Sequence, residues 1–280
     1  MSQRFQKLTE LMAALRAPQG CPWDRKQTHE SLKPYLLEET YEVLETIDQH
    51  DRRKMAEELG DVLLQVLFHS QIAAEAGTFT IDDVLERLAD KLVRRHPHVF
   101  PNGAGDPVPT NAEQVLAKWE DIKRAEREAE GRPASVLDGV PQTLPALLRA
   151  YQIQARASRV GFDWSHDQAG FDQLLTKIEE EIREFRTALR QPSSADGGRQ
   201  AEIEAEFGDV LFSLVNLGRF VKVNPEDALR QAVNRFSSRF QYIEREAARQ
   251  GRAVVDLSFD EMNRLWEDAK RQPPAEDARD

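Results

Sequence analysis

The sequence has a single cysteine, Cys21, so it cannot form an internal disulfide, and a reducing compartment is expected for it. It also lacks any apolar run of the length that a helix needs to cross a bilayer. Residues 1–15 lack the apolar core of a signal peptide and predict an amphipathic helix instead. We therefore expect a cytoplasmic protein with no membrane partner.

Basic residues are in the minority, with 38 Lys and Arg against 49 Asp and Glu and a net charge of −11. This balance disfavours sequence-independent binding to nucleic acid or to an anionic membrane. The glycines form neither a P-loop nor a G-x-G-x-x-G pattern, so a Walker-type nucleotide enzyme finds no support. An anionic ligand would need a metal ion or a local basic cluster.

Apolar residues recur every three or four positions along most of the chain, a spacing typical of amphipathic helices. Segments with the strict alternation of a strand are absent from the sequence. Thr80-x-x-Asp83 and Asn224-Pro225 predict the starts of two helices, and Gly77 predicts the end of another. The sequence therefore predicts an all-α fold.

The length of 280 residues allows one large domain or two of ordinary size. PNGAGDPVPTN at 101–111 is the clearest break, a charged helix is expected at 112–131, and SVLDGVPQTLP at 135–145 is a second break. The resulting division has four parts: an N-terminal domain at 1–101, a linker with the charged helix at 102–143, a C-terminal domain at 144–270 and a disordered tail at 271–280.

An internal repeat dominates the pattern of acidic residues. Glu38-Glu39-x-x-Glu42 precedes Glu58-x-x-Asp61 in the first half, and the second half has the same two motifs in the same order, at Glu180-Glu181-x-x-Glu184 and Glu206-x-x-Asp209. Upstream, GCPWD at 20–24 matches GFDW at 161–164, and downstream Asp90, Lys91 and Arg95 match Asn234, Arg235 and Arg239. Two copies of one helical unit occupy the chain, while Trp119 and Trp266 are interpreted as packing residues outside the repeat.

Within each copy, the acids of one motif lie three or four positions apart and so share a helix face. Two facing helices would bring four or five carboxylates together, a ligand set that suits Mg²⁺ first and then Mn²⁺ or Ca²⁺. Di-iron sites use Glu-x-x-His, and none of the six histidines follows a glutamate by three. The alternative is a solvated acidic face that both copies inherited.

A metal cluster followed by basic residues one helix later favours a phosphorylated substrate. Lys91, Arg94 and Arg95, or Arg235 and Arg239, could hold phosphate oxygens, although pairing with surface acids is the alternative, above all for Arg94. Trp23 and Trp164 could stack on a nucleobase, with core packing as the alternative. Cys21 has no paired histidine in a motif and is interpreted as inert.

The order of motifs resembles the bacterial MazG family of nucleoside triphosphate pyrophosphohydrolases. The resemblance rests on EETYEVLE, EELGDVLLQVLFHSQIA and DKLVRRHPHVF in the first half and on VGFDW, EEIREF, EFGDVLFSLVNLGRF and NRFSSRF in the second, and it covers nearly the whole chain. It implies tandem all-α MazG domains with four-helix-bundle-like cores completed in a homodimer. It also implies Mg²⁺-dependent cleavage of NTPs and dNTPs to monophosphate and pyrophosphate, with broad base tolerance and a housecleaning or stress-related role.

The resemblance also assigns roles to residues. The implied metal ligands are Glu38, Glu39, Glu42, Glu58 and Asp61 in the first copy and Glu180, Glu181, Glu184, Glu206 and Asp209 in the second. The second set is expected to be catalytic, with Mn²⁺ as a possible substitute for Mg²⁺, and Glu181 or Glu184 is expected to orient or deprotonate the attacking water. The substrate-binding candidates are Asn234, Arg235, Arg239, Trp164, Lys91 and Arg95, and Arg235 replaces a lysine that is frequent in the family.

Two other functions are compatible with the same motifs. One is a catalytically silent helical module that binds nucleotide or metal and serves dimerisation or regulation. The other is a narrower hydrolase of the same fold, acting on dUTP alone or on a phosphoribosyl-ATP. Complete acidic motifs in both copies argue against the silent module.

Overall fold

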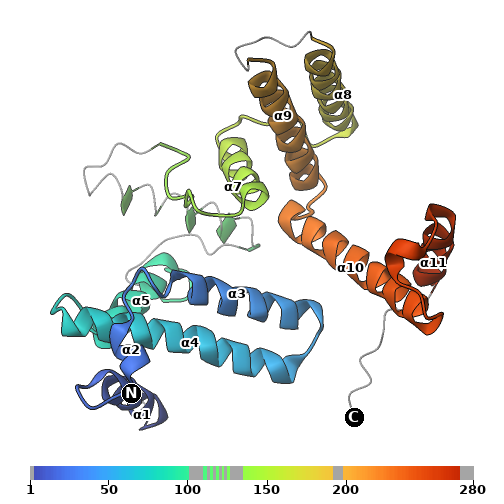
Figure 1. Cartoon of the computed structure of the whole chain (residues 1–280). Helices are drawn as coiled ribbons and strands as arrows, with labels where there is room; N and C mark the ends of the chain where they lie inside the picture. Colours follow the sequence, from blue (N-terminus) through green and yellow to red (C-terminus); the bar gives the residue numbers. More distant parts are fainter. Residues whose placement is uncertain are drawn as a thin grey trace. The chain divides into compact units, whose positions relative to one another are not determined.

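The computed structural model describes residues 3–100, 135–191 and 198–271, together with single positions between 110 and 126. Every regular element in these residues is helical, which confirms the predicted all-α fold. The chain divides into two compact units, Met1–Gly131 and Arg132–Asp280 (Figure 1). This division falls inside the predicted linker, and the first unit includes the segment at 112–131. None of the described helices is both long and apolar enough to cross a membrane.

The first unit contains five described helices before residue 100: α1 (Gln3–Arg16), α2 (Pro22–Lys26), α3 (Lys33–Asp48), α4 (Arg52–Glu75) and α5 (Ile81–Arg95). Helices α3 and α4 lie side by side as an antiparallel hairpin (Figure 1). Met12, Leu32, Leu67, Phe68 and Ile81 form the buried core, which fastens α1 and α5 to the hairpin.

The helix boundaries in this unit follow from local chemistry. Asp51 caps α4, since its carboxylate accepts hydrogen bonds from the backbone amides of Arg53 and Lys54. The predicted start of α5 is confirmed as a capping box, in which the Thr80 amide donates to the Asp83 carboxylate. Gly77 follows α4 with a φ of 66°, a conformation that glycine adopts without strain.

Two histidines join the segment before α3 to α4. The Nδ1 atoms of His29 and His69 are 2.8 Å apart, and the ring planes differ by only 4°. Because the two rings are nearly parallel, the separation of their planes cannot exceed the distance between the two nitrogens. The ring centres are 5.1 Å apart, so the rings are displaced sideways and do not stack face to face. The contact is a hydrogen bond, in which one Nδ1 donates a proton and the other accepts it.

The second unit contains α7 (Ala146–Arg159), α8 (Gln168–Arg190), α9 (Gly198–Phe220), α10 (Pro225–Arg249), a 3-10 turn η1 (Val254–Asp256) and α11 (Phe259–Arg271). Helices α8 and α9 form the second long hairpin (Figure 1). The predicted start of α10 is confirmed, because the Asn224 side chain accepts a hydrogen bond from the Glu226 amide and Pro225 opens the helix. Ile243, Ala247 and Leu257 form a core with α11, against which Trp266 packs.

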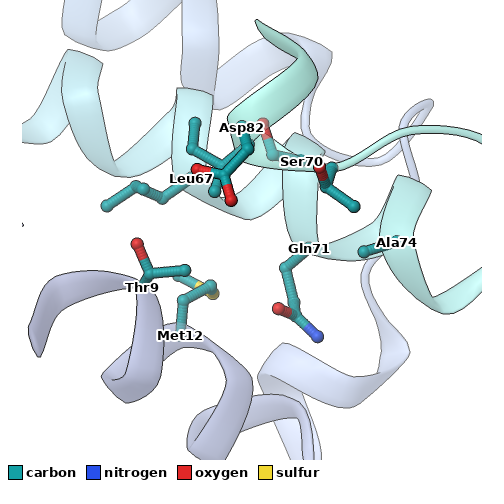
Figure 2. A pocket seen from close by; sticks show the side chains of 9 residues that line it. Thr9, Met12, Leu67, Ser70, Gln71, Ala74 and Asp82 are labelled. Carbon is teal, nitrogen blue, oxygen red and sulfur yellow. The ribbon is translucent and has the colours of Figure 1, made fainter. Parts of the chain in front are cut away.

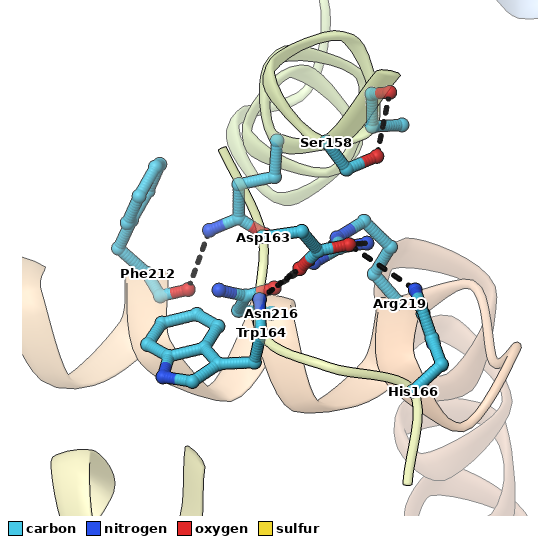
Figure 3. A network of polar contacts seen from close by, with 9 residues as sticks. Ser158, Asp163, Trp164, His166, Phe212, Asn216 and Arg219 are labelled. Atoms are coloured by element: carbon cyan, nitrogen blue, oxygen red, sulfur yellow. Dashed lines mark hydrogen bonds and ion pairs between the residues drawn. The ribbon is translucent and has the colours of Figure 1, made fainter. Parts of the chain in front are cut away.

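A polar network fixes the segment before α8 onto α9 (Figure 3). The Asp163 carboxylate accepts hydrogen bonds from both terminal nitrogens of Arg219, one at 2.8 Å, and the two side chains are only 11% and 9% exposed. Arg219 also donates to Asn216, and the Trp164 amide donates to Asp163. The network therefore holds Trp164 beside α9 at a defined place.

Candidate metal centre

The Glu-x-x-Asp motifs lie in the first half of the second helix of each hairpin. On α4, Glu58 and Asp61 are three positions apart and share a face, and the preceding helix α3 presents Glu39 to them. One carboxylate oxygen from each of these three residues lies within 4.8 Å of the others. The facing helices thus form one acidic cluster in the first unit.

The second unit repeats this arrangement. Glu181 of α8 and the pair Glu206 and Asp209 of α9 each offer an oxygen within 4.8 Å of the other two. One acid of each cluster is buried: Glu181 is only 7% exposed and Glu58 only 6%. They are not equivalent in the repeat, since Glu181 corresponds to Glu39 and Glu58 to Glu206. Buried carboxylates are costly unless a cation or hydrogen-bond donors compensate them, so each cluster calls for positive charge.

The pKa values of two clustered acids reflect how close the carboxylates lie to one another. Burial and then the charges of Asp61, Glu42, Glu38 and Glu58 raise the pKa of Glu39. Burial and then the charges of Glu184, Asp209, Glu181 and Glu202 raise the pKa of Glu206. Carboxyl groups that resist ionisation next to one another are the expected state of a hard-cation site without its ion.

The remaining predicted ligands lie around these clusters. A hydrogen bond with Glu58, followed by the charge of Glu58, raises the pKa of Glu42, and two carboxyl groups share such a bond only through a proton. The charge of Glu184 helps to raise the pKa of Glu206, and the charge of Glu38 helps to raise the pKa of Glu39. Glu180 is not among the three converging acids, and its carboxylate accepts a hydrogen bond from a lysine.

That lysine, Lys177, is a residue that the sequence reasoning missed. Its ammonium lies 2.9 Å from the Glu180 carboxylate and 2.8 Å from the Glu181 carboxylate, and these hydrogen bonds raise its pKa. The signal was present, because a lysine three and four positions before two acids reaches both on a helix. In the first unit Tyr35 occupies the equivalent position, and Lys54 lies 3.4 Å from Glu58 instead.

The donor set fits a divalent hard cation. Three carboxylates converge in each unit, and one of them in each cluster, Glu39 or Glu206, has a raised pKa. A side-chain cation, Lys177, already lies beside the buried Glu181. Oxygen ligands of this kind suit Mg²⁺ or Mn²⁺. Among the described residues, no histidine or cysteine belongs to either cluster, which agrees with the argument against a di-iron site.

The predicted substrate-binding residues of the second unit lie on α10. Asn234 and Arg235 are exposed, and the Arg239 guanidinium lies 5.5 Å from the centre of the Trp266 ring on α11. Within the described residues, none of these three side chains makes a hydrogen bond or ion pair to the acidic cluster. The packing interpretation of Trp266 is confirmed by its place against the core of α10 and α11.

In the first unit the basic residues after the hairpin have a partner. Lys91 is exposed, but Arg94 Nε and Arg95 Nη2 each lie 2.7 Å from a different oxygen of the Glu126 carboxylate. Pairing with an acid, the alternative for Arg94, is therefore what the structure shows. It shows the same for Arg95, a predicted substrate-binding residue.

The tryptophans at the start of the repeat differ in exposure. Trp23 is 49% exposed and makes edge contacts to Tyr35 and Phe68, while Trp164 is half-buried beside α9. Packing contacts thus exist at both rings, and Trp23 also keeps an exposed surface.

A separate cavity of about 230 Å³ opens between α1, α4 and the start of α5 (Figure 2). Thr9, Met12, Ser70, Gln71 and Asp82 are among its lining residues. None of the clustered acids lines it, and its lining mixes core side chains with polar groups. The acidic clusters, and not this cavity, are the candidate site.

Comparison with known proteins agrees with this assignment. The family model described as "MazG nucleotide pyrophosphohydrolase domain" matches residues 27–100. A Thermotoga maritima protein, "Nucleoside triphosphate pyrophosphohydrolase/pyrophosphatase MazG", is 46% identical over 266 residues, which cover 95% of each chain. The Escherichia coli "Nucleoside triphosphate pyrophosphohydrolase" is 41% identical over 270 residues, 96% of this chain and 98% of that protein. Bacillus subtilis YabN is 46% identical over 266 residues, but the match spans only 51% of that longer protein.

Proposed function

The chain belongs to the MazG family of nucleoside triphosphate pyrophosphohydrolases, and on that premise we propose that it cleaves NTPs and dNTPs between the α and β phosphates with Mg²⁺. It is an enzyme, a hydrolase acting on acid anhydrides. The observation that carries the proposal is the convergence of Glu181, Glu206 and Asp209 from two facing helices. The products are a nucleoside monophosphate and pyrophosphate.

The acids of the second unit would hold the cation: Glu181, Glu206 and Asp209, with Glu180 and Glu184 beside them. When bound, Mg²⁺, or Mn²⁺ in its place, would supply positive charge to the triphosphate and lower the pKa of a bound water. The first unit offers the matching set of Glu39, Glu58 and Asp61, with Glu38 and Glu42.

The chain's own residues have distinct tasks in this proposal. Glu181 or Glu184 orients the attacking water and takes its proton, since a carboxylate within hydrogen-bond reach of a bound water can act as its general base. Arg235 and Arg239 bind the departing pyrophosphate with planar forks, and Asn234 adds a neutral donor. Trp164, fixed beside α9 by the Asp163 network, contacts the base through its ring, which fits broad base tolerance because stacking reads little of the base. Lys91 and Arg95 are the counterparts in the first copy.

We also propose that the protein is a homodimer, in which paired hairpins complete four-helix cores. Helix α9 supports this, because Phe207, Leu211, Phe212 and Leu214 are 38–50% exposed on it. On α10, Phe236 is 58% exposed. A cytoplasmic housecleaning enzyme that removes unwanted nucleotides, or acts in stress, agrees with the broad substrate range proposed here.

The test is product analysis with the four NTPs and four dNTPs, with and without Mg²⁺, resolving monophosphate from diphosphate. Metal-dependent monophosphate and pyrophosphate from most of them would support the proposal. Turnover of dUTP alone would support the narrower hydrolase, and binding without turnover would support the silent module. Asp209→Asn should abolish turnover, while the matched variant Asp61→Asn reports on the first copy. Near-normal turnover in Asp209→Asn would contradict the site.

A further inference from the structure

The internal repeat extends one helix further than its acidic and basic motifs. Trp119-Glu120-Asp121-x-Lys123-Arg124 matches Trp266-Glu267-Asp268-x-Lys270-Arg271, with the same spacing in both. Contrary to the expectation from sequence, Trp119 and Trp266 are therefore part of the repeat. The described residues between 114 and 126 are helical, as is α11.

The contacts of the two tryptophan segments are also equivalent. In the second unit, Arg239 of α10 lies over the Trp266 ring. In the first unit, Trp119 packs edge-on against His96, which directly follows Arg95, the counterpart of Arg239. In each unit the helix after the acidic hairpin thus presents its basic residues to a tryptophan segment.

The two copies differ in what the basic residues bind. Arg94 and Arg95 hold the two oxygens of Glu126 at 2.7 Å each. The second copy has Ser238 in place of Arg94, and the position that corresponds to Glu126 is Pro273 in the sequence. In the described residues, Arg235 and Arg239 form no ion pair within 4.0 Å, although the charge of Arg239 acts on the nearby Glu267 of α11. The extra arginine and its carboxylate therefore occur together in the first copy only.

Glu126 is a firmly held anion. Its hydrogen bond with Arg95 opposes the effect of burial and, with that from Arg94, lowers the pKa of Glu126, so it stays ionised at neutral pH. A carboxylate held by two guanidinium groups occupies the donors that would otherwise hold phosphate oxygens. Two further donors at this contact, Arg95 Nε and Trp119 Nε1, are buried and have no acceptor among the described residues. The contact has more donors than Glu126 uses.

We propose that Arg94 and Arg95 form a pyrophosphate-binding site in the first unit, and that Glu126 occupies it from within the chain. The inference rests on the proposed function, since Arg239, the counterpart of Arg95, is assigned there to pyrophosphate. The ligand is a pyrophosphate group, free or at the end of a nucleotide. Glu126 excludes it from the first copy, whereas the second copy has Pro273 at that position in the sequence, and no carboxylate holds Arg239 in the described residues.

The competing explanation is a purely structural clamp, in which Glu126 only fastens the tryptophan segment to α5. The two explanations differ in one observable. If Glu126 blocks a binding site, removal of its charge frees that site for a ligand. If Glu126 is only a clamp, removal of its charge lowers stability and adds no binding.

The experiment is a calorimetric titration of the full chain with imidodiphosphate, a non-hydrolysable pyrophosphate analogue, in the presence of Mg²⁺. Wild-type protein should bind it in the second copy only, and Glu126→Gln should add a second site per chain, at least about tenfold tighter than any such binding in the wild type. Arg95→Ala in the Glu126→Gln background should remove that site. Glu75→Gln, which breaks the Arg16 ion pair elsewhere in the first unit, is the matched control and should bind as wild type.

Two results would overturn the proposal: a folded Glu126→Gln protein with wild-type stoichiometry, or a wild-type protein that already binds two ligands per chain with equal affinity. If Glu126→Gln fails to fold, Glu126→Ala replaces it, because it also removes the carboxylate and leaves Arg94 and Arg95 in place, and it should add the same second site. Failure of the proposed function is distinguishable, since wild-type protein would then show no turnover and no binding in the second copy, whatever Glu126→Gln does.

Discussion

The ammonium of Lys177 lies 2.8 Å from the carboxylate of Glu181, the most buried acid of the second cluster. The same carboxylate faces Glu206 and Asp209 from the next helix. A metal ion in this cluster would share the Glu181 carboxylate with the Lys177 ammonium. We therefore expect the two cations to compete for it.

Replacement of Lys177 by methionine should tighten metal binding to the nucleotide-free protein. The competing pair is partly exposed, so the expected gain in Mn²⁺ affinity is about twofold to fivefold. Titration followed by the paramagnetic signal of free Mn²⁺ measures it. Lys270→Met, which breaks an exposed pair with Glu267 on α11, is the matched control and should leave the affinity unchanged. Unchanged or weaker Mn²⁺ binding in Lys177→Met would show that the lysine does not compete.

Neutralisation of one clustered acid should weaken metal binding without lowering the stability of the metal-free protein. Glu206→Gln removes repulsion from Asp209 and Glu184, so the metal-free variant should melt no lower than wild type. The increase in melting temperature that Mg²⁺ gives the wild type should shrink or vanish in the variant, because a ligand is lost. Thermal scans with and without Mg²⁺ test both statements. A full Mg²⁺-dependent increase in Glu206→Gln would exclude that side chain as a ligand.

As the pH falls, metal binding should begin to weaken at a higher pH than it would if the carboxyl groups had their usual pKa values. Glu39 and Glu206 have pKa values raised above the usual 4.5, so in the folded, metal-free protein they take up protons at a pH where an unfolded chain would not. Their ionisation costs stability as pH rises through the raised pKa, and a bound cation relieves that cost. The Mg²⁺-induced shift in melting temperature, followed from about pH 7.5 down to about pH 5, should fall steadily. A constant shift over that range would contradict it.

The histidine pair predicts a second pH effect, confined to the first unit. Burial, followed by the charge of His29, lowers the pKa of His69 below its usual 6.5. The folded state then favours the neutral ring, so its contribution is complete above that pH and is lost as pH falls below it. NMR titration should place the His69 pKa below 6.5, and His29→Gln should raise it. A His69 pKa that is the same in both proteins would show that the rings do not interact.

The buried ion pair between Asp163 and Arg219 should contribute more to the unfolding free energy than an exposed pair does. Arg219→Met leaves the buried Asp163 carboxylate with only His166, at 3.2 Å, as a side-chain partner, which should cost about 3 kcal/mol of unfolding free energy. Asp163→Asn together with Arg219→Met should cost less than the sum of the single changes, since neither charge is then stranded. Denaturant unfolding measures all three. The exposed Arg249, paired with Glu246, is the comparison, and its loss should cost under about 1 kcal/mol.

Local patterns were enough to predict most of the helical framework. The caps at Thr80 and Asn224 and the helix end at Gly77 follow from short-range chemistry, and each lies where the sequence placed it. The hairpins follow from helical periodicity combined with the repeat. The convergence of Glu39 with Glu58 and Asp61 could likewise be expected, because motif spacing fixes which face each acid occupies.

Contacts between distant segments could not be predicted in this way. Nothing near Asp163 in the sequence points to Arg219, and nothing near Arg95 points to Glu126. Such pairs depend on how helices pack, which periodicity does not specify. The roles given to Asn234, Arg235 and Arg239, the metal and the homodimer remain predictions, to be decided by the experiments above.

The hairpin architecture has a kinetic consequence. The acids of each cluster come from two consecutive helices, so no distant part of the chain is needed to bring them together. Contacts that are local in sequence form early and rapidly, because little loop-closure entropy opposes them. We therefore expect the first cluster to assemble during synthesis, as soon as α4 has left the ribosome, while the second half of the chain is still being made.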